Sequence, residues 1–239
     1  MLTITLKPAQ DLKAHELTAL YSLARRTGFP LANNYIESAH FVYNPTVVMA
    51  HSGDQLLGFQ SYNTYRLRTP FFRGEVPFIY GGLAFQDYAL AGRGLGYRLS
   101  RYYMRQTLGR LFFLRPYAFA IRTPTPRLMQ ILAVQHQLVH FKNGLLTPDV
   151  LQFALHFVRN VRRFEYPIDD RLVVRGEPVH ADISEQWSRL FGASEAAYNQ
   201  LAYEADLVRV EGGSHFLTGN YLLLLGHSSW RKLWGSLWT

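Results

Sequence analysis

The sequence predicts a mixed α/β fold organised around one β-sheet. Short apolar or alternating runs, typical of strands, are interleaved with segments whose apolar residues recur at helical spacing. Two of the strand runs flank Ser52-Gly53-Asp54, a turn sequence that indicates a β-hairpin inside the sheet. The length of 239 residues suits one large domain, or one domain with a sizeable extension.

The predicted strands share an apolar or alternating pattern bounded by turn residues. They cover residues 2–7, 46–51, 55–67, 75–85, 117–121, 172–175 and 221–225. The strand at residues 75–85 contains two adjacent glycines, Gly81 and Gly82, which weaken an ordinary strand. They indicate either a bulge or bend in the strand or a ligand that lies against its backbone.

The predicted helices follow from apolar spacing and from residues typical of helix ends. They cover residues 11–26, 35–43, 97–106, 126–136, 147–163 and 183–191. Gly28-Phe29-Pro30 ends the first helix, while Pro126 and Pro148 open later ones, because proline is tolerated in a first turn.

Composition limits the classes of partner. The net charge of +8 and pI near 9.8 favour nucleic acid, an anionic membrane, an acidic carrier protein or a phosphorylated cofactor. A basic surface that serves solubility alone is the alternative. The sequence contains no cysteine, which excludes disulfides, thiolate metal sites and cysteine nucleophiles. The N-terminus lacks a signal-peptide pattern and no apolar run approaches the roughly 18 residues that cross a bilayer, so we expect a cytoplasmic protein.

A glycine-rich turn separates the strand at residues 75–85 from the helix at residues 97–106. Its sequence is Ala91-Gly92-Arg93-Gly94-Leu95-Gly96. Glycine allows close approach of the backbone, and the free N–H groups and dipole of a helix N-terminus favour an anion. We therefore expect a phosphate or pyrophosphate here. A Walker A loop fits worse because Tyr97-Arg98 follows the last glycine, and a dinucleotide fingerprint fits worse because the glycines are spaced by two.

The order hairpin, apolar strand, glycine turn, helix, strand and helix resembles the acyl-CoA-dependent N-acyltransferases of the GNAT superfamily. Their signature turn is Arg/Gln-x-x-Gly-x-Gly/Ala, which Gly94 and Gly96 match, while Ala91 replaces the first residue. The resemblance covers about residues 2–137. It implies a GNAT-like acyl-CoA N-acyltransferase fold with a C-terminal extension. The acyl-CoA-binding core would comprise residues 1–145. Residues 146–239 would complete the sheet or form a surface for the acceptor or for a dimer.

The resemblance also implies an acetyl-CoA or longer acyl-CoA donor and no metal. Backbone N–H groups of Arg93 to Gly96 would bind the pyrophosphate, with added charge from Arg93. The exposed backbone of Gly81, Gly82, Leu83 and Ala84 would pair with the pantetheine arm. The arginines on one face of the following helix would bind the CoA 3′-phosphate or an acidic acyl carrier protein, or are simply solvated; they are Arg98, Arg101 and Arg105.

Acyl transfer to an amine needs a base for the ammonium proton and an acid for the leaving thiolate. By resemblance Glu75 is the first candidate base and Asp87 the second, with an exposed turn residue as the alternative for Glu75. Met129 occupies the position where the family typically carries its tyrosine acid. Tyr88, Tyr102 or His136 would then serve as the acid that protonates the leaving thiolate.

Other signals are weaker. His136 and His140 have the spacing of a helical metal pair, but Gln137 replaces the glutamate of His-Glu-x-x-His and no third ligand is evident. The tail from Trp230 to Trp238 has amphipathic spacing, which indicates packing on the sheet or on a partner subunit, or peripheral membrane contact. The acceptor would be a small-molecule or protein amine. The rival functions are a non-catalytic module that binds acyl-CoA or an anionic partner, and nucleic-acid binding, which rests on charge alone.

Overall fold

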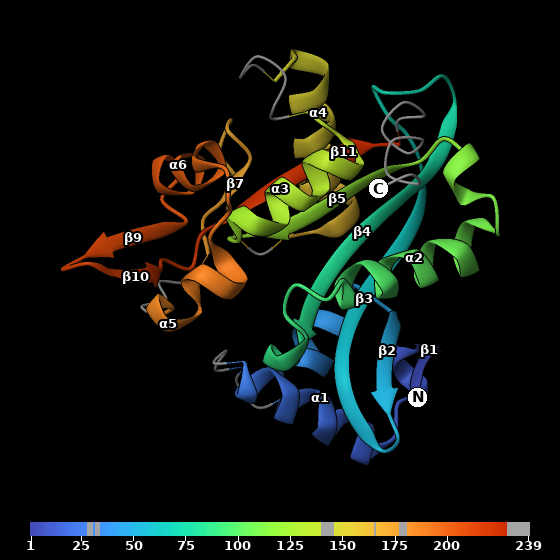
Figure 1. Ribbon diagram of the computed structural model, residues 1–239. Coiled ribbons are helices and arrows are strands. Elements are labelled where there is room, and N and C mark those ends of the chain that lie inside the picture. The colour runs from blue at the N-terminus through green and yellow to red at the C-terminus, as the bar shows by residue number, and fades with distance from the viewer. Residues whose placement is uncertain (28–30, 32–33, 140–145, 165, 177–180, 229–239) are drawn as a thin grey trace. The chain divides into compact units, whose positions relative to one another are not determined.

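The computed structural model describes the chain except residues 28–30, 32–33, 140–145, 165, 177–180 and 229–239 (Figure 1). The chain forms two compact units. The first comprises Met1–Tyr65 and Ile79–Arg115, and the second comprises Arg66–Phe78 and Pro116–Thr239. Each unit thus contains two separate stretches of sequence. The predicted mixed α/β class is confirmed.

The first unit contains strands in the order β1-β2-β3-β4, and the pairs β1–β2 and β2–β3 are antiparallel. Its elements are β1 (Leu2–Pro8), α1 (Ala14–Arg26), a π-helical turn (Ile36–Phe41), β2 (Thr46–Ser52), β3 (Gln55–Arg68), β4 (Glu75–Gln86) and α2 (Leu95–Leu108). The predicted hairpin is confirmed, with Val47 paired to Ser61 and Ser52 to Gln55. Gly53 turns the chain between β2 and β3 at φ 56°, a backbone conformation that favours glycine.

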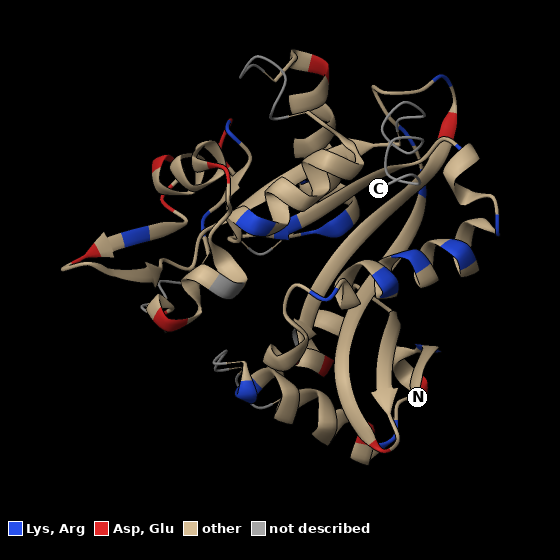
Figure 2. Cartoon of the chain, in the orientation of Figure 1, with Lys and Arg blue, Asp and Glu red and all other residues tan. Residues whose placement is uncertain are grey.

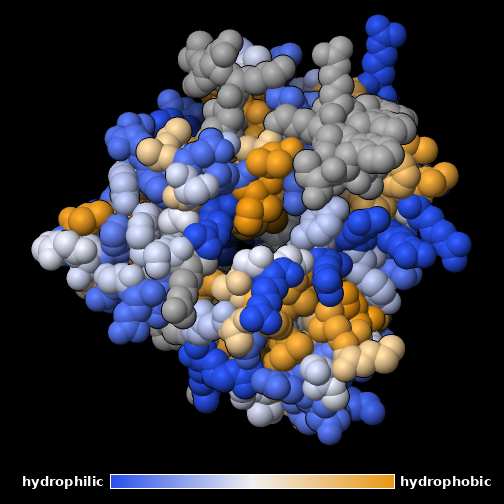
Figure 3. Space-filling view, viewed as in Figure 1, coloured by the Kyte–Doolittle hydropathy of each residue, from blue (hydrophilic) through white to orange (hydrophobic). Residues whose placement is uncertain are grey.

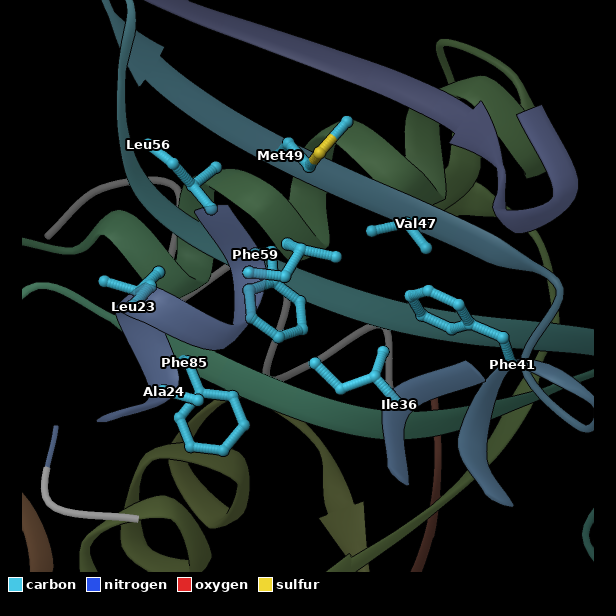
Figure 4. Packing of buried hydrophobic residues seen from close by; sticks show 10 residues of the cluster. Leu23, Ala24, Ile36, Phe41, Val47, Met49, Leu56, Phe59 and Phe85 are labelled. Carbon is cyan, nitrogen blue, oxygen red and sulfur yellow. The ribbon is translucent and has the colours of Figure 1, made fainter. Parts of the chain in front are cut away.

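The core of the first unit lies between its sheet and the helices α1 and Ile36–Phe41 (Figure 4). Val47 and Met49 of β2 point to the same side because successive strand residues alternate. The rings of Phe59 on β3 and Phe85 on β4 lie 5.5 Å apart between their centroids. The buried residues of this cluster are Leu20, Leu23, Ala24, Ile36, Phe41, Val47, Met49, Leu56, Phe59 and Phe85. The apolar spacing of α1 therefore serves this core.

The second unit contains a sheet and a small separate one. Its elements are β5 (Ala118–Thr123), α3 (Pro126–Gln135), β6 (Gln137–Leu138), α4 (Pro148–His156), β7 (Val173–Val174), β8 (Ala181–Asp182), α5 (Ser184–Gln186), α6 (Ala196–Glu204), β9 (Val208–Glu211), β10 (Ser214–Leu217) and β11 (Tyr221–His227). β11 pairs with β5, β6 and β7, and the small sheet has the order β8-β10-β9. Leu222 to Leu225 are all buried, which explains the continuous apolar run of β11.

Several elements differ from the sequence prediction at their ends. The helix predicted at residues 11–26 begins at Ala14, after a short 3-10 turn. The helix predicted at residues 147–163 is α-helical to His156 and then π-helical over Phe157–Arg162. Helix α6 and the β9–β10 hairpin were not predicted. The tail pattern and His140 lie outside the described residues. Among the residues described, no helix has the length and apolarity needed to cross a membrane.

Candidate functional site

The segment after β4 is fixed by the backbone and carboxylate of Asp87. Its N–H donates to the carbonyl of Leu57 on β3 at 2.8 Å. Its carboxylate accepts the N–H of Ala89 at 3.0 Å and so caps the short 3-10 turn Tyr88–Leu90. The Arg26 guanidinium lies 3.9 Å from the other carboxylate oxygen. This predicted base therefore has a structural role at the entry to the glycine turn.

Two glycines in the turn have left-handed backbone conformations. Gly92 has φ 76° and Gly94, the N-cap residue of α2, has φ 74°. A Cβ built at either position would meet no atom within 4 Å. Glycine is therefore favoured at both positions by backbone conformation, because a side chain would be strained there whatever the space.

Four consecutive backbone N–H groups at the start of α2 have no acceptor in the described protein. Arg93 donates its N–H to the carbonyl of Leu90, and Arg98 donates to the carbonyl of Gly94, both at 3.0 Å. Between them, Gly94, Leu95, Gly96 and Tyr97 make no such bond within the described residues. Unpaired N–H groups at a helix N-terminus form an anion site. The set predicted as Arg93 to Gly96 is therefore shifted by one residue, because the helix begins at Leu95 and the Arg93 amide closes the preceding turn.

Close packing fixes the first turn of α2 against the sheet. Leu95 is buried, and an ideal Cβ on Gly58 of β3 would lie only 2.9 Å from its side chain. A Cβ on Gly96 would lie 3.4 Å from the amide nitrogen of Gln60, also on β3. The glycines at positions 58 and 96 therefore allow the helix to approach the strand. The four free amides lie in the helical turn that this packing holds against β3.

A tyrosine pair extends this contact along the helix. Tyr62 on β3 stacks on Tyr103 of α2, with ring centroids 4.1 Å apart. The Tyr62 hydroxyl donates to Ser100 of α2 at 2.9 Å, and the hydroxyls of Tyr103 and Thr64 lie 2.7 Å apart. Burial raises the pKa of both tyrosines above its ordinary value. Both rings therefore remain neutral and act as buried hydrogen-bonding anchors.

The predicted double glycine of β4 lies against a buried polar cluster. The N–H of Leu83 donates to Nε2 of His40 at 2.7 Å and to Oγ of Ser61 at 3.0 Å. An ideal Cβ on Gly82 would lie 2.5 Å from each of these side-chain atoms and 2.7 Å from the amide nitrogen of Asn44. His40, Asn44 and Ser61 are all buried. Glycine at position 82 is thus required by the protein's own side chains, and the Leu83 amide predicted to meet pantetheine has partners inside the fold.

The remaining predicted acid–base groups lie in different surroundings. Glu75 is exposed at the start of β4, in the part of the strand that belongs to the second unit. The Tyr88 hydroxyl donates to the carbonyl of Thr27. Met129 is fully buried in α3, so its position is an apolar packing site. His136 has Nδ1 3.4 Å from the Tyr117 hydroxyl, both in the second unit.

No sequence pattern pointed to His40, Asn44 or Ser61. His40 and Asn44 come from the segment before β2, and Ser61 lies on β3. Only the register of the sheet brings them under Gly82, and the double glycine was the single local sign of their presence. No group of metal-ligating residues that could hold an ion occurs in the described part of the chain.

No protein-family model matches the sequence, and no curated protein matches it. The chain is similar to N-acyltransferases of known structure. An acyl-CoA N-acyltransferase from Pseudomonas aeruginosa is 24% identical over 50% of this chain and 79% of its own, with a TM-score of 0.33.

Two further solved structures are similar to part of this chain. NAA60 of Arabidopsis thaliana, solved with acetyl-CoA, is 14% identical over 60% of this chain and 94% of its own, with a TM-score of 0.38. The ribosomal-protein-S18-alanine N-acetyltransferase of Escherichia coli is 15% identical over 50% of this chain and 68% of its own, with a TM-score of 0.34.

Proposed function

We propose that this protein is an N-acyltransferase that takes its acyl group from a phosphopantetheine thioester, such as acetyl-CoA or a longer acyl-CoA. The observation that carries the proposal is the set of free amides of Gly94 to Tyr97, at the start of α2 and directly after the β4 turn. This helix end offers several converging donors to the pyrophosphate of CoA, and the exposed Arg93 adds positive charge beside them.

The proposed reaction is direct transfer. The neutral nitrogen of an amine attacks the thioester carbonyl, a C–N bond forms, the C–S bond breaks, and the amine's proton leaves while the thiolate becomes a thiol. Glu75 remains the candidate base by resemblance and exposure, whereas Asp87 and Tyr88 each hold the turn through a hydrogen bond. The acceptor class is an amine, on a small molecule or on a protein.

The binding step is tested by thermal unfolding with acetyl-CoA, octanoyl-CoA, dephospho-CoA and pantetheine. A ligand at a hundred times its Kd stabilises the native state by about 2.7 kcal/mol. The first three compounds carry the pyrophosphate and should raise Tm, while pantetheine, which lacks phosphate, should raise it far less. No shift with any CoA compound would remove the proposal.

One observation favours a second candidate, a non-catalytic module that binds the same thioester. Residue 129 is a fully buried methionine. N-acyltransferases of the GNAT superfamily typically carry a tyrosine acid at the corresponding position. Release of free thiol with a panel of amines separates the two functions. Stabilisation by acyl-CoA without thiol release would favour the binding module.

A further inference from the structure

Helix α2 carries a row of arginines that we call the basic row: Arg98, Arg101, Arg105 and, just beyond the helix, Arg110. All four are exposed. Within the described residues none of their side chains has a hydrogen bond or an ion pair to another group of the protein. No carboxylate occurs in the sequence between Asp87 and Asp149. Figure 2 accordingly shows α2 with basic segments and no acidic ones.

The basic row does not stabilise the helix that carries it. Like charges one turn apart destabilise a helix by roughly 0.2–0.5 kcal/mol per pair. A cation is favoured by the helix dipole only near the C-terminus, which explains Arg105 but not Arg98, four residues from the N-terminal end. Three arginines at helical spacing without an acidic neighbour therefore point to an external anion.

The length of the basic row favours a macromolecule over a small ligand. At a rise of 1.5 Å per residue, Arg98 and Arg105 are about 10 Å apart along the axis, and Arg110 extends the row further. The phosphates of one CoA molecule cannot meet all of these positions. Near its far end the surface has a hollow of about 500 Å³, lined by Tyr102, Arg105, Gln106, Gly109 and Arg110. Because Arg105 and Arg110 both line this hollow, it favours an acidic side chain.

Apolar side chains near the basic row favour a protein over a nucleic acid. Tyr97 is 43% exposed and Leu111 is 57% exposed, at opposite ends of the row. Figure 3 shows hydrophobic residues beside strongly hydrophilic ones on this face of the molecule. Tyrosine and arginine are both enriched in protein–protein interfaces, and guanidinium groups pair well with carboxylates.

We infer that the basic row docks an acidic carrier protein that presents the acyl group on a phosphopantetheine arm. This inference rests on the proposed function, because the free amides of Gly94 to Tyr97 lie at the start of the same helix. A carrier seated along α2 brings its phosphodiester to those amides, and its arm continues toward β4. CoA uses only the N-terminal end of this surface.

The test compares Arg101→Glu with Arg159→Glu. Arg159 is also exposed and also lacks a partner among the described residues, so both variants change the net charge equally. The first measurement is the affinity for a purified acidic acyl carrier protein without its arm, at low and high salt. Arg101→Glu should weaken binding at least tenfold, Arg159→Glu should leave it within twofold, and salt should weaken the wild-type complex.

The second measurement is the KM for the same acyl group on the carrier and on CoA. Arg101→Glu should raise KM for the carrier donor at least tenfold and leave KM for acyl-CoA within twofold. Equal losses with both donors would instead assign the row to the CoA 3′-phosphate and overturn the inference. Absence of carrier binding would overturn it too, as would loss of RNA binding in Arg101→Glu with unchanged carrier affinity.

The two proposals fail in different ways. Carrier binding that depends on Arg101, without Tm shifts by CoA compounds and without thiol release, would support the docking surface and overturn the proposed function. Tm shifts by CoA compounds without carrier binding would support the proposed function and overturn the docking surface.

Discussion

The N–H of Leu83 donates to Nε2 of His40 across 2.7 Å, in the middle of the strand that leads to the glycine turn. Because Ser61 accepts the same N–H at 3.0 Å, this position of β4 is held by side chains from two other segments of the first unit. The free amides at the start of α2 thus follow a strand whose local shape is fixed from within the protein.

Replacing Gly82 with alanine should destabilise the protein by about 1–3 kcal/mol, the usual cost of overpacking. The added Cβ would lie 2.5 Å from both His40 Nε2 and Ser61 Oγ. Urea denaturation measures the effect. Gly96→Ala is the matched control, since its nearest contact is 3.4 Å from a flexible amide and alanine is the better helix former. Equal stability of Gly82→Ala and wild type would contradict the assigned packing.

Replacing His40 with alanine should cost about 1–3 kcal/mol, because a buried N–H loses one of its two acceptors and a cavity is left beside it. His40→Gln keeps an acceptor of similar reach and should recover part of the loss. Both variants are compared by denaturant unfolding. If glutamine were no better than alanine, the Leu83 hydrogen bond would not be the source of the stability.

Replacing Tyr97 with proline should weaken CoA binding about tenfold. A hydrogen bond to a charged group contributes about 1.5 kcal/mol, and its loss corresponds to that factor. Proline removes one of the free amides and is tolerated in the first turn of a helix. Calorimetric titration with CoA gives the Kd. Tyr97→Ala removes the side chain but keeps the amide, so it should bind CoA as the wild type does. A similar loss in both variants would place the effect in the tyrosine ring.

Replacing Glu16 with glutamine should lower stability by about 0.5–1 kcal/mol at neutral pH, a value reduced for partial exposure. Glu16 caps α1 by accepting the Lys13 N–H at 2.9 Å and pairs with Lys7 at 2.6 Å. The Lys13 hydrogen bond and then Lys7 hold the pKa of this carboxyl below its ordinary value of 4.5.

A carboxylate with a lowered pKa stabilises the folded state above the unfolded-state pKa, and its contribution is lost as the pH falls through the folded-state pKa. The gap between wild type and Glu16→Gln should therefore be full above pH 4.5 and shrink below it. Thermal unfolding between pH 3 and pH 7 checks this. A gap that stayed constant over that range would exclude the ionised carboxylate as its cause.

Short-range sequence patterns predicted the order of elements up to α3, the β2–β3 hairpin and the position of the glycine turn. Apolar spacing indicated α1 and α3, and proline marked the starts of α3 and α4. The late α6 and the short β9–β10 hairpin were missed, since α6 is only weakly amphipathic and β9 is mostly exposed.

Which atoms of the site form hydrogen bonds depends on long-range packing. Helix α2 begins two residues earlier than its pattern indicated, so the free amides run from Gly94 to Tyr97 and the Arg93 amide closes a turn. His40 and Ser61 meet Gly82 through strand register, a relationship between residues far apart in the sequence that no local pattern records. Gly81 and Gly82 indicated a bend in the strand or a group lying against its backbone. The atoms that lie there, from His40, Asn44 and Ser61, are set by long-range packing.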